Sequence, residues 1–350
     1  MKTPMQLQRQ RGPAPTITPI PALDRDGEMP LVEAFMRRLC RDEGFLGDVA
    51  VQHLDGGGKR IRAKLALAAA EGFGLDPIAA APLAAACELL HNATLIHDDL
   101  QDGDRLRRGR PATWVVHGEA QAINAGDLML MLPWAAVEHL SCPDATRWHL
   151  SRAIATRARA CVAGQALEMA LAQRGRTDWT GWYEAARGKT GELLALPIEG
   201  AALLAGWSPE RARALGDAFC SVGLLYQLRD DLIDLYGDKG RSKVGNDLRE
   251  GKHSALVVEH LRLAPEDRKW LLRILTTPRD DTSDSDVEFT SSRFMESGAV
   301  RAVIERMQDL ADELLGADVM QDAPAVRGIA DGLIALLLRP IGVLDLERTQ

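Results

Sequence analysis

From about Glu33 onward, apolar residues recur mostly at spacings of three and four, and alanine and leucine are abundant. This spacing is that of one face of an α-helix. Runs of β-branched residues flanked by turn signals, which are typical of strands, are absent. The pattern therefore predicts helices almost throughout, with long examples over Lys64–Gly72, Ala79–Leu100, Gln121–Leu140, Thr146–Ala172, Trp182–Leu204, Pro209–Leu235 and Ala299–Leu315.

Glycine-rich and polar stretches separate these segments, at Asp55–Gly58, Gly103–Pro111, Gly237–Gly251 and Thr276–Ser292. The last of them is predicted to be a mobile surface loop. Residues 1–28 are polar and proline-rich near their start, and we expect a disordered or loosely attached tail there. Residues 29–350 are expected to form one all-α domain, an antiparallel helical bundle.

Composition narrows the class of protein. The 350 residues are 46% hydrophobic, enough for one large core, yet contain no uncharged apolar run of 18 residues and no apolar signal-peptide core. The five cysteines are scattered singly, as expected for reduced thiols in a cytoplasmic protein. The net charge of −8 argues against a nucleic-acid partner. An anionic substrate would need local basic groups or a metal ion.

Two aspartate clusters share the spacing D-D-x-x-D: Asp98, Asp99 and Asp102, and Asp230, Asp231 and Asp234. On a helix, positions i and i+4 lie on one face, about 6 Å apart along the axis. Paired carboxylates at this spacing repel one another unless a cation lies between them, and hard oxygen ligands suit Mg²⁺. One such cluster alone could be a solvated helix face. Two, each following an apolar helical segment, predict a metal site.

Basic residues accompany the clusters. Arg107 and Arg108 follow the first one, and Gly56–Gly58 precede Lys59 and Arg62, which are one helical turn apart. A glycine-rich turn that enters a helix exposes backbone N–H groups and suits a diphosphate. His91 lies two turns before Asp98 on the same face, where a buried structural histidine and a ligand are equally good interpretations.

Together these segments resemble the trans-isoprenyl diphosphate synthase (polyprenyl synthetase) family, in particular geranylgeranyl diphosphate synthases. The resemblance covers about Gly56 to Ser254 and rests on seven blocks in the family's order: GGGKRIR (56–62), ELLHNATLIHDDLQDGDRLRRGRP (88–111), NAGD (124–127), GQALEM (164–169), KTGELLALP (189–197), YQLRDDLIDLYGD (226–238) and KVGNDLREGKHS (243–254). It implies the isoprenoid synthase fold, with helices around a central cavity. It also implies a homodimer.

The resemblance further implies a reaction in which isopentenyl diphosphate is condensed with dimethylallyl, geranyl or farnesyl diphosphate. Three Mg²⁺ ions, with Mn²⁺ as an alternative, would be held by Asp98, Asp99, Asp102, Asp230, Asp231 and Asp234. The allylic diphosphate would contact Arg107, Lys189, Thr190, Gln227, Lys243 and Lys252. Isopentenyl diphosphate would be held by Lys59, Arg62, His91 and Arg108. Asp98, Asp99, Asp102, Asp230, Asp231, Asp234, Lys189 and Arg107 are the expected catalytic set.

There are small departures from the family pattern. Glu168 replaces the usual aspartate, and Ala63 replaces a proline. The segment between Asp234 and Lys243 is one residue shorter than in common farnesyl synthases, which makes the placement of Lys243 less secure than that of Lys252.

Product length depends on the helix that carries Asp98. The family's length-setting positions match Ala93 and Thr94, both small, so the product can reach C20 or more, and geranylgeranyl diphosphate is favoured over farnesyl or longer polyprenyl products. Met129, with Met131 and Trp134, would form either a deeper floor of this pocket or plain core.

Other activities fit less well. A class I terpene cyclase usually has a second metal motif of Asn, Ser and Glu, and it lacks the second diphosphate site. A head-to-head synthase of the squalene type would carry D-x-x-x-D pairs. A non-catalytic subunit of a heteromeric synthase normally lacks one aspartate cluster, and this chain has both.

Overall fold

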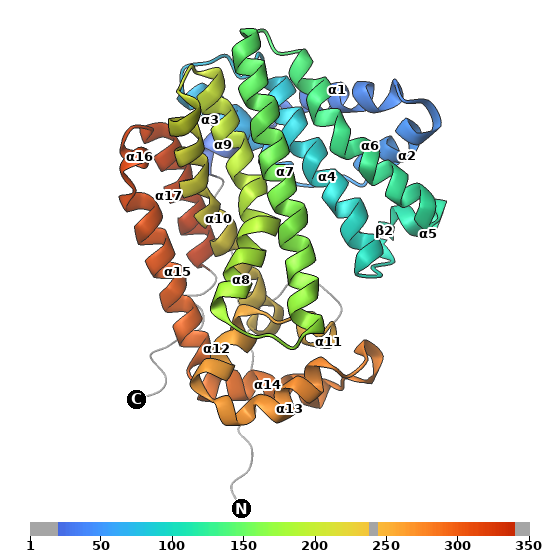
Figure 1. Ribbon diagram of the computed structural model, residues 1–350, viewed down its shortest axis with the longest axis vertical. Helices are drawn as coiled ribbons and strands as arrows, with labels where there is room; N and C mark the ends of the chain where they lie inside the picture. The colour runs from blue at the N-terminus through green and yellow to red at the C-terminus, as the bar shows by residue number, and fades with distance from the viewer. Residues whose placement is uncertain (1–19, 238–243, 340–350) are drawn as a thin grey trace, which may run out of the picture.

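The computed structural model describes residues 20–237 and 244–339, and the prediction of an all-helical bundle is confirmed (Figure 1). The longer helices are α1 (Met29–Arg41), α2 (Gly44–Leu54), α3 (Ile61–Gly72), α4 (Ala81–Gln101), α6 (Glu119–Glu138), α7 (Asp144–Gln173), α8 (Trp179–Ala186), α9 (Glu192–Leu204), α10 (Pro209–Tyr236), α12 (Ala255–Leu263), α13 (Arg268–Leu275), α14 (Asp284–Glu296), α15 (Ala299–Gly316) and α17 (Pro324–Leu338). Shorter elements are η1 (Pro21–Leu23), α5 (Thr113–His117), the π-helical turn η2 (Arg187–Gly191), α11 (Asn246–Arg249), η3 (Pro265–Asp267), η4 (Arg279–Asp281) and α16 (Asp318–Gln321).

Helices α4, α7, α9 and α10 run beside one another through the middle of the molecule, with α15 and α17 on one side and α2, α5 and α6 on the other (Figure 1). One continuous apolar core joins them, built largely from alanine and leucine. Small residues let the helices approach closely. A Cβ added at Gly164 of α7 would lie 2.4 Å from the backbone nitrogen of Lys189, so this crossing requires glycine.

After α4, two short strands, β1 (Leu106–Arg107) and β2 (Arg110–Pro111), form an antiparallel hairpin. Its turn contains Arg108 (φ 54°) and Gly109 (φ 77°), both in the left-handed region. The hairpin begins just beyond the carboxyl end of α4, where Asp102 follows the last helical residue. It therefore brings Arg107 and Arg108 close to the first aspartate cluster.

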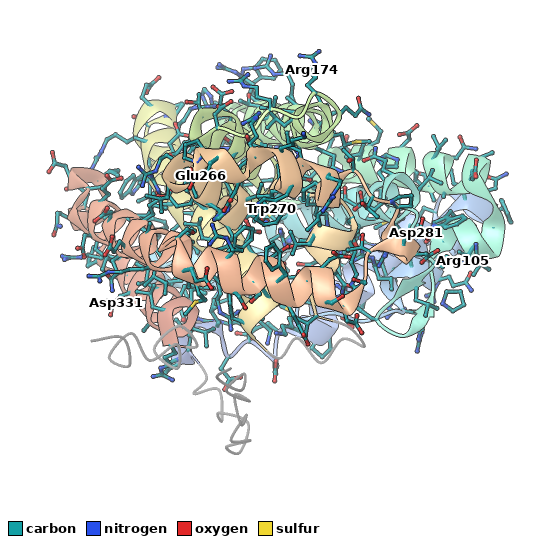
Figure 2. All side chains as sticks on the ribbon, turned by 90° about the horizontal axis from the view of Figure 1, so that it is seen from below. Arg105, Arg174, Glu266, Trp270, Asp281 and Asp331 are labelled. Carbon is teal, nitrogen blue, oxygen red and sulfur yellow. The ribbon has the colours of Figure 1, made fainter. Side chains whose placement is uncertain are left out.

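The predicted mobile loop over 276–292 is wrong for most of its length, because α14 begins at Asp284. Ser283 caps this helix. Its hydroxyl accepts from the backbone N–H of Asp286, and the Asp286 carboxylate accepts from the N–H of Ser283, which is a capping box. Val287 and Phe294 are then buried on one face. Figure 2, seen from below, has Asp281 and Arg105 on the same side of the lower face, which is covered by α13 and α14.

Residues 20–28, which are part of the predicted tail, pack against the helical body. Leu23 is buried, and Arg25 forms ion pairs with Glu28 at the start of α1 and with Glu71 of α3. These contacts lie on residues with no helical period, so the apolar pattern did not reveal them. Residues 1–19 of the predicted tail lie outside the described residues. Within the described ranges, no helix has the length and apolar composition needed to cross a membrane.

Candidate active site

The three aspartates of the first cluster lie on two different faces of α4. Asp98 is on the last turn of α4 and Asp102 caps that helix, so they share one face, while Asp99 is turned about 100° away. Asp99 is 1% exposed, and its Oδ1 accepts from Arg107 Nε at 2.6 Å. Burial raises the pKa of Asp98 to about 6, against the opposing charge of Lys189 and together with that of Asp102. The ionised form of Asp98 is therefore destabilised by burial, and the charge of Lys189 compensates for this only in part.

The second cluster lies near the end of α10. Asp231 is 3% exposed; its Oδ1 accepts from Gln227 Nε2 at 2.9 Å and its Oδ2 from the Ala255 backbone N–H at 2.7 Å. Burial, and then the charge of Asp247, raise the pKa of Asp231 to about 8. Asp234 is also buried and accepts from the backbone N–H of Asp247 at 3.0 Å. Asp230 is half-buried, and its charge contributes to the raised pKa of Asp231.

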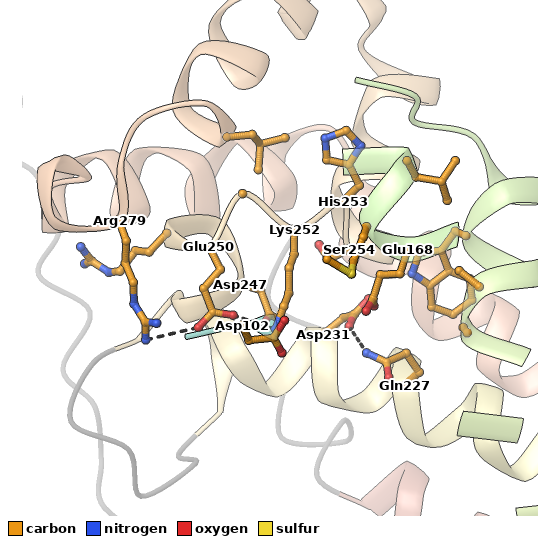
Figure 3. Close-up of a pocket in the computed structure, with 18 of the residues that line it drawn as sticks. Asp102, Glu168, Gln227, Asp231, Asp247, Glu250, Lys252, His253, Ser254 and Arg279 are labelled. Atoms are coloured by element: carbon orange, nitrogen blue, oxygen red, sulfur yellow. Dashed lines mark hydrogen bonds and ion pairs between the residues drawn. The ribbon is translucent and has the colours of Figure 1, made fainter. Parts of the chain in front are cut away.

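One cavity of about 450 Å³ is lined from both clusters, by Asp102 of the first and Asp231 of the second (Figure 3). Its acidic lining residues are Asp102, Glu168, Asp231, Asp247 and Glu250, five in all, against the three cations Arg249, Lys252 and Arg279. Arg249 is turned to Thr282 and Asp284, which leaves even less positive charge for the cavity. An acidic cavity of this kind binds a diphosphate only if further cations enter with it.

The cations near the carboxylates are held by neighbouring acids. Lys189 Nζ, on the π-helical turn η2, lies 2.5 Å from Glu168, and Lys252 Nζ lies 2.7 Å from Glu250 and 3.6 Å from Asp247. Burial alone would lower the pKa of Lys252, but Asp247 and Glu250 outweigh it and raise the pKa. The pKa of Lys189 is raised in the same way, chiefly by Glu168 and Asp98 acting against burial. Both side chains are therefore fully charged at neutral pH.

Two further residues of the predicted diphosphate site, Thr190 and Gln227, meet at 3.4 Å between Thr190 Oγ1 and Gln227 Oε1. Lys243 lies outside the described residues. Arg279 was not expected here, because it belongs to the stretch predicted as a surface loop. It forms an ion pair with Glu250 at 3.2 Å (Figure 3). A second ion pair joins it to Asp104 at 3.8 Å. No local sequence signal identifies it, since these contacts join segments that are far apart in the chain.

A second group of basic residues lies between α3, α4 and the hairpin. Arg62 Nε and His91 Nδ1 are buried, and neither has a hydrogen-bond partner among the residues that the structure describes. Burial, and then the charge of Arg62, lower the pKa of His91 well below its usual value, so the imidazole is neutral. Lys59 is exposed. Arg108 donates to the carbonyl of Gly57. Gly58 has a φ of 134°, which favours glycine, and a Cβ there would also lie 2.6 Å from the Arg108 guanidinium, which would have to shift.

The neighbouring Arg60 has a different environment. It is 5% exposed, and its guanidinium donates to Glu33 at 3.0 Å and to the carbonyl of Leu54 at 2.8 Å. This side chain ties the glycine loop to α1 and α2. Within the described residues, Arg60 Nη1 and Arg62 Nε are both buried without a hydrogen-bond partner, but Arg60 is anchored through its other nitrogens and has Glu88 3.8 Å from Nη1.

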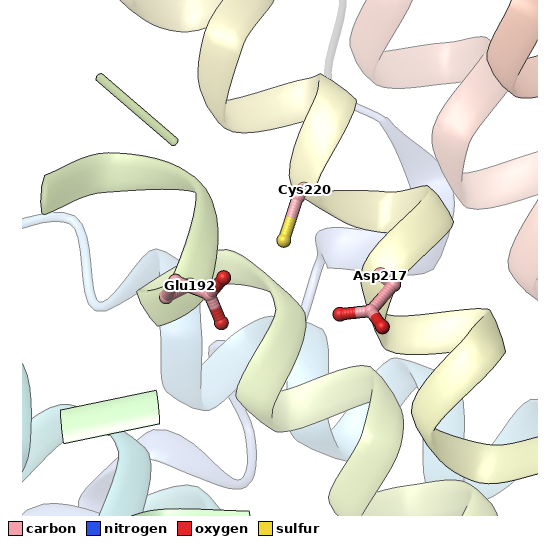
Figure 4. A group of neighbouring side chains, drawn as sticks. All are labelled: Glu192, Asp217 and Cys220. Atoms are coloured by element: carbon pink, nitrogen blue, oxygen red, sulfur yellow. The ribbon is translucent and has the colours of Figure 1, made fainter. Parts of the chain in front are cut away.

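A buried cluster of one arginine and three carboxylates packs next to the turn η2. Arg157 of α7 is fully buried and contacts Glu192, Glu199 and Asp217. Glu192 and Asp217 also lie near Cys220 (Figure 4). Because Arg157 already lies between these carboxylates, they do not form a free metal site. Glu192 directly follows η2, so the group holds the turn that carries Lys189 and Thr190.

The expected product-length residues lie along α4 and α6. Ala93 and Met129 are fully buried, and Thr94 is half-buried with its hydroxyl donating to the carbonyl of His91 at 2.8 Å. Met131 is 61% exposed, which excludes both the floor and the core interpretations for it in the single chain. Trp134 is half-buried and packs against the core.

Comparison with known proteins identifies the family. The model of the family described as polyprenyl synthetase matches residues 44–292. A short chain isoprenyl diphosphate synthase of Methanothermobacter thermautotrophicus is 38% identical over 65% of this chain and 70% of that protein. A geranylgeranyl pyrophosphate synthase of Geoglobus acetivorans is 32% identical over 74% and 80%. The crystal structure of a polyprenyl synthase from Caulobacter crescentus, complexed with calcium and isoprenyl diphosphate, is 25% identical, with a TM-score of 0.78 over 93% of this chain and 99% of that one.

Proposed function

We propose, from the premise that this chain belongs to the polyprenyl synthetase family, that it is a magnesium-dependent synthase whose main product is geranylgeranyl diphosphate. Membership makes it a trans-prenyl diphosphate synthase. Magnesium dependence is proposed from the cavity lined by Asp102 of one cluster and Asp231 of the other, where acidic side chains outnumber basic ones five to three. Two anionic substrates would enter a site that is already acidic, so divalent ions must come with them.

The donor set fits magnesium. Asp98 and Asp102 lie on one face of α4, and Asp231 of the second cluster lines the same cavity as Asp102. Asp230 and Asp234 are proposed as further ligands on the resemblance. Asp99 would orient Arg107, whose Nε donates a hydrogen bond to Asp99 Oδ1 at 2.6 Å. The related Caulobacter protein was crystallised with calcium and isoprenyl diphosphate. Bound magnesium would supply charge stabilisation to a departing diphosphate.

The chain's own residues would complete this neutralisation. Lys189, Lys252 and Arg107, with Thr190 and Gln227, would contact the allylic diphosphate and orient its C–O bond. Fixed cations in a partly dry cavity stabilise developing negative charge without reorganisation. Lys243 is proposed as a further contact on the resemblance alone. Lys189 and Lys252 would exchange their ion pairs with Glu168 and Glu250 for contacts with the more highly charged diphosphate.

Isopentenyl diphosphate would be held by Lys59, Arg62, His91 and Arg108. Support comes from the unpartnered Arg62 Nε and His91 Nδ1, because buried polar atoms without partners are costly unless a ligand satisfies them. A neutral His91 can donate one hydrogen bond to a phosphate oxygen. The two diphosphates would then be held from different sides, with the reacting carbons between them.

The test is Asp98→Ala and Asp230→Ala, assayed for diphosphate release with isopentenyl diphosphate and each allylic primer under magnesium. Each change should lower turnover by orders of magnitude without changing the far-UV circular dichroism. Asp144→Ala is the matched control, because the Asp144 side chain is 95% exposed on α7. Wild-type turnover in either cluster variant would contradict the proposal. Cyclised product without isopentenyl consumption would indicate a cyclase, and activity that appears only with a second protein would indicate a heteromeric subunit.

Product length is proposed from small side chains. Ala93 is fully buried one turn before the metal-binding face, with Thr94 beside it and Met129 buried on α6. A pocket bordered by alanine leaves room for a longer tail than one closed by an aromatic ring. Ala93→Phe should therefore shift the product from C20 towards C15, measured by chromatography of the dephosphorylated products. An unchanged product length would exclude Ala93 from the pocket wall.

A homodimer is proposed from the outer faces of α6 and α7. Trp148 and Val162 of α7, two heptads apart, are 64% and 56% exposed, and Ile123 and Met131 of α6 are 47% and 61% exposed. Large exposed apolar side chains grouped on neighbouring helices are typical of an interface. Light scattering should give twice the chain mass of 38.1 kDa. Trp148→Glu should reduce it to one chain mass, and a monomeric wild-type protein would contradict this assignment.

A further inference from the structure

A second pocket, separate from the acidic cavity, opens between α2, the β1–β2 hairpin and α5. It has a volume of about 240 Å³ and is lined on its polar side by Gln52, His53, Arg107, Arg108, Arg110 and His117. We call it the hairpin pocket. Among the described residues that line it, none is acidic. In a chain with a net charge of −8, three arginines around an opening without a carboxylate require an explanation.

Two of these arginines have incomplete hydrogen bonding. Arg110 Nη1 donates to the carbonyl of Asp55 at 2.9 Å, and Arg108 Nη1 donates to the carbonyl of Gly57. A guanidinium has five N–H donors, so each retains several. Within residues 20–237 and 244–339, neither forms an ion pair, whereas Arg107 is paired with Asp99. Burial and the nearby charges of Arg60 and Arg107 lower the pKa of Arg108, which is the effect of cations held close together.

His53 adds a buried polar atom to the pocket wall. Its Nδ1 lies 3.3 Å from Thr113 Oγ1, and the Asn92 side chain also interacts with the ring. Among the described residues, its buried Nε2 has no partner that meets the geometric criteria of a hydrogen bond. Burial, and then the charges of Arg107 and Arg108, lower the pKa of His53 to about 3, so the ring stays neutral and can present one N–H. An unpaired nitrogen beside free guanidinium donors would be satisfied by one oxyanion.

We propose that the hairpin pocket is a metal-independent binding site for a phosphate-class anion, held by His53, Arg108 and Arg110. It differs from the acidic cavity in that its positive charge belongs to the protein itself. Inorganic phosphate and the diphosphate released by the reaction share the required chemistry. Arg108 also belongs to the proposed isopentenyl diphosphate site, and on that proposed function an anion in the hairpin pocket would compete for its donors.

The direct test is calorimetric titration of the full-length protein in EDTA and low chloride, with inorganic phosphate in one arm and diphosphate in the other. The tighter of the two anions is the preferred ligand. Arg110→Gln and His53→Gln should each weaken this binding about tenfold, the loss of one charge-assisted or buried hydrogen bond. Lys59→Ala is the control, because Lys59 belongs only to the proposed isopentenyl diphosphate site, and it should bind the anion as the wild type does.

Several outcomes would overturn the site. Binding that is lost in Lys59→Ala but kept in Arg110→Gln would place the anion in the substrate site, and no metal-free binding of either anion at millimolar concentration would remove the site altogether. Arg110 is exposed, so its variant tests the idea even if His53→Gln does not fold. In turnover assays, added phosphate should raise the KM for isopentenyl diphosphate in the wild type and not in Arg110→Gln. The titrations use no prenyl substrate, so they stand or fall separately from the proposed synthase activity.

Discussion

Replacing Arg157 by methionine tests how the turn that carries Lys189 is held in place. The Arg157 guanidinium lies 2.5 Å from Glu192, 2.6 Å from Glu199 and 2.7 Å from Asp217, and its side chain is completely buried. Arg187 reaches Glu192 at 3.6 Å and Asp217 at 3.2 Å, so these two carboxylates keep a cation in the variant. Glu199 has no other cation in the described part of the chain.

The expected cost is large because a charge is stranded. Removing one partner of a buried ion pair typically destabilises a protein by about 3–5 kcal/mol, whereas an exposed helical pair contributes about 0.3–0.5 kcal/mol. Arg301–Glu305 on α15 is such an exposed pair, at 2.9 Å and with side chains 71% and 58% exposed. Arg301→Gln is therefore the matched control. Urea unfolding followed by circular dichroism should separate the two variants by several kcal/mol.

The double variant Arg157→Met with Glu199→Gln isolates the stranded carboxylate. Because the neutral amide no longer needs a cation, the double variant should be more stable than Arg157→Met alone, by at least about 1 kcal/mol. A loss in Arg157→Met no larger than in Arg301→Gln would refute the reasoning. So would a double variant in which the two losses simply add.

Three further outcomes are expected. Arg279 and Lys252 both pair with Glu250, so in Arg279→Gln the Glu250 carboxylate should hold Lys252 away from the allylic diphosphate and raise its KM several-fold. Adding Glu250→Gln should restore the KM. A failure to do so would mean that Arg279 acts by direct contact. Burial raises the pKa of Asp98 to about 6, so in metal-free protein this carboxyl favours folding below its unfolded pKa and that stability is lost as pH rises through about 6. Magnesium binds the deprotonated form, and the gain in Tm on adding it should be larger at pH 7.5 than at pH 5; equal gains would contradict the site. Ser283→Ala removes the cap of α14 and should cost about 1 kcal/mol in urea unfolding, while Ser292→Ala within the same helix should be nearly neutral.

The helical bundle was predictable because its signal is periodic and local. Helix α14 was missed for the opposite reason: its exposed face is so polar that composition outweighed the period. The capping signal was nevertheless present, since Ser283 is followed three residues later by Asp286 and the buried positions Val287 and Phe294 are two turns apart. The cap and this spacing together are the local signals of α14.

The roles within an aspartate cluster could be read only in part. Helical geometry alone places Asp99 on a different face from Asp98 and Asp102. Its hydrogen-bond donor, Arg107, comes from the hairpin and could not be identified from that geometry. Arg279 reaches the cavity only because η4 packs beside the loop after α4, a tertiary contact with no local pattern. Residues that reach a site from distant segments cannot be assigned by spacing.

The hairpin also explains how one acidic protein could hold two kinds of anion site next to each other. Arg107 is paired with Asp99 and does not line the acidic cavity, where acidic side chains outnumber basic ones. On the other side, Arg108 and Arg110 are held by carbonyl oxygens, which fix a guanidinium without cancelling its charge. On the two proposals above, a diphosphate would enter the cavity together with divalent ions, and an anion in the hairpin pocket would need none. Chelation of metal should therefore abolish the first kind of binding and preserve the second.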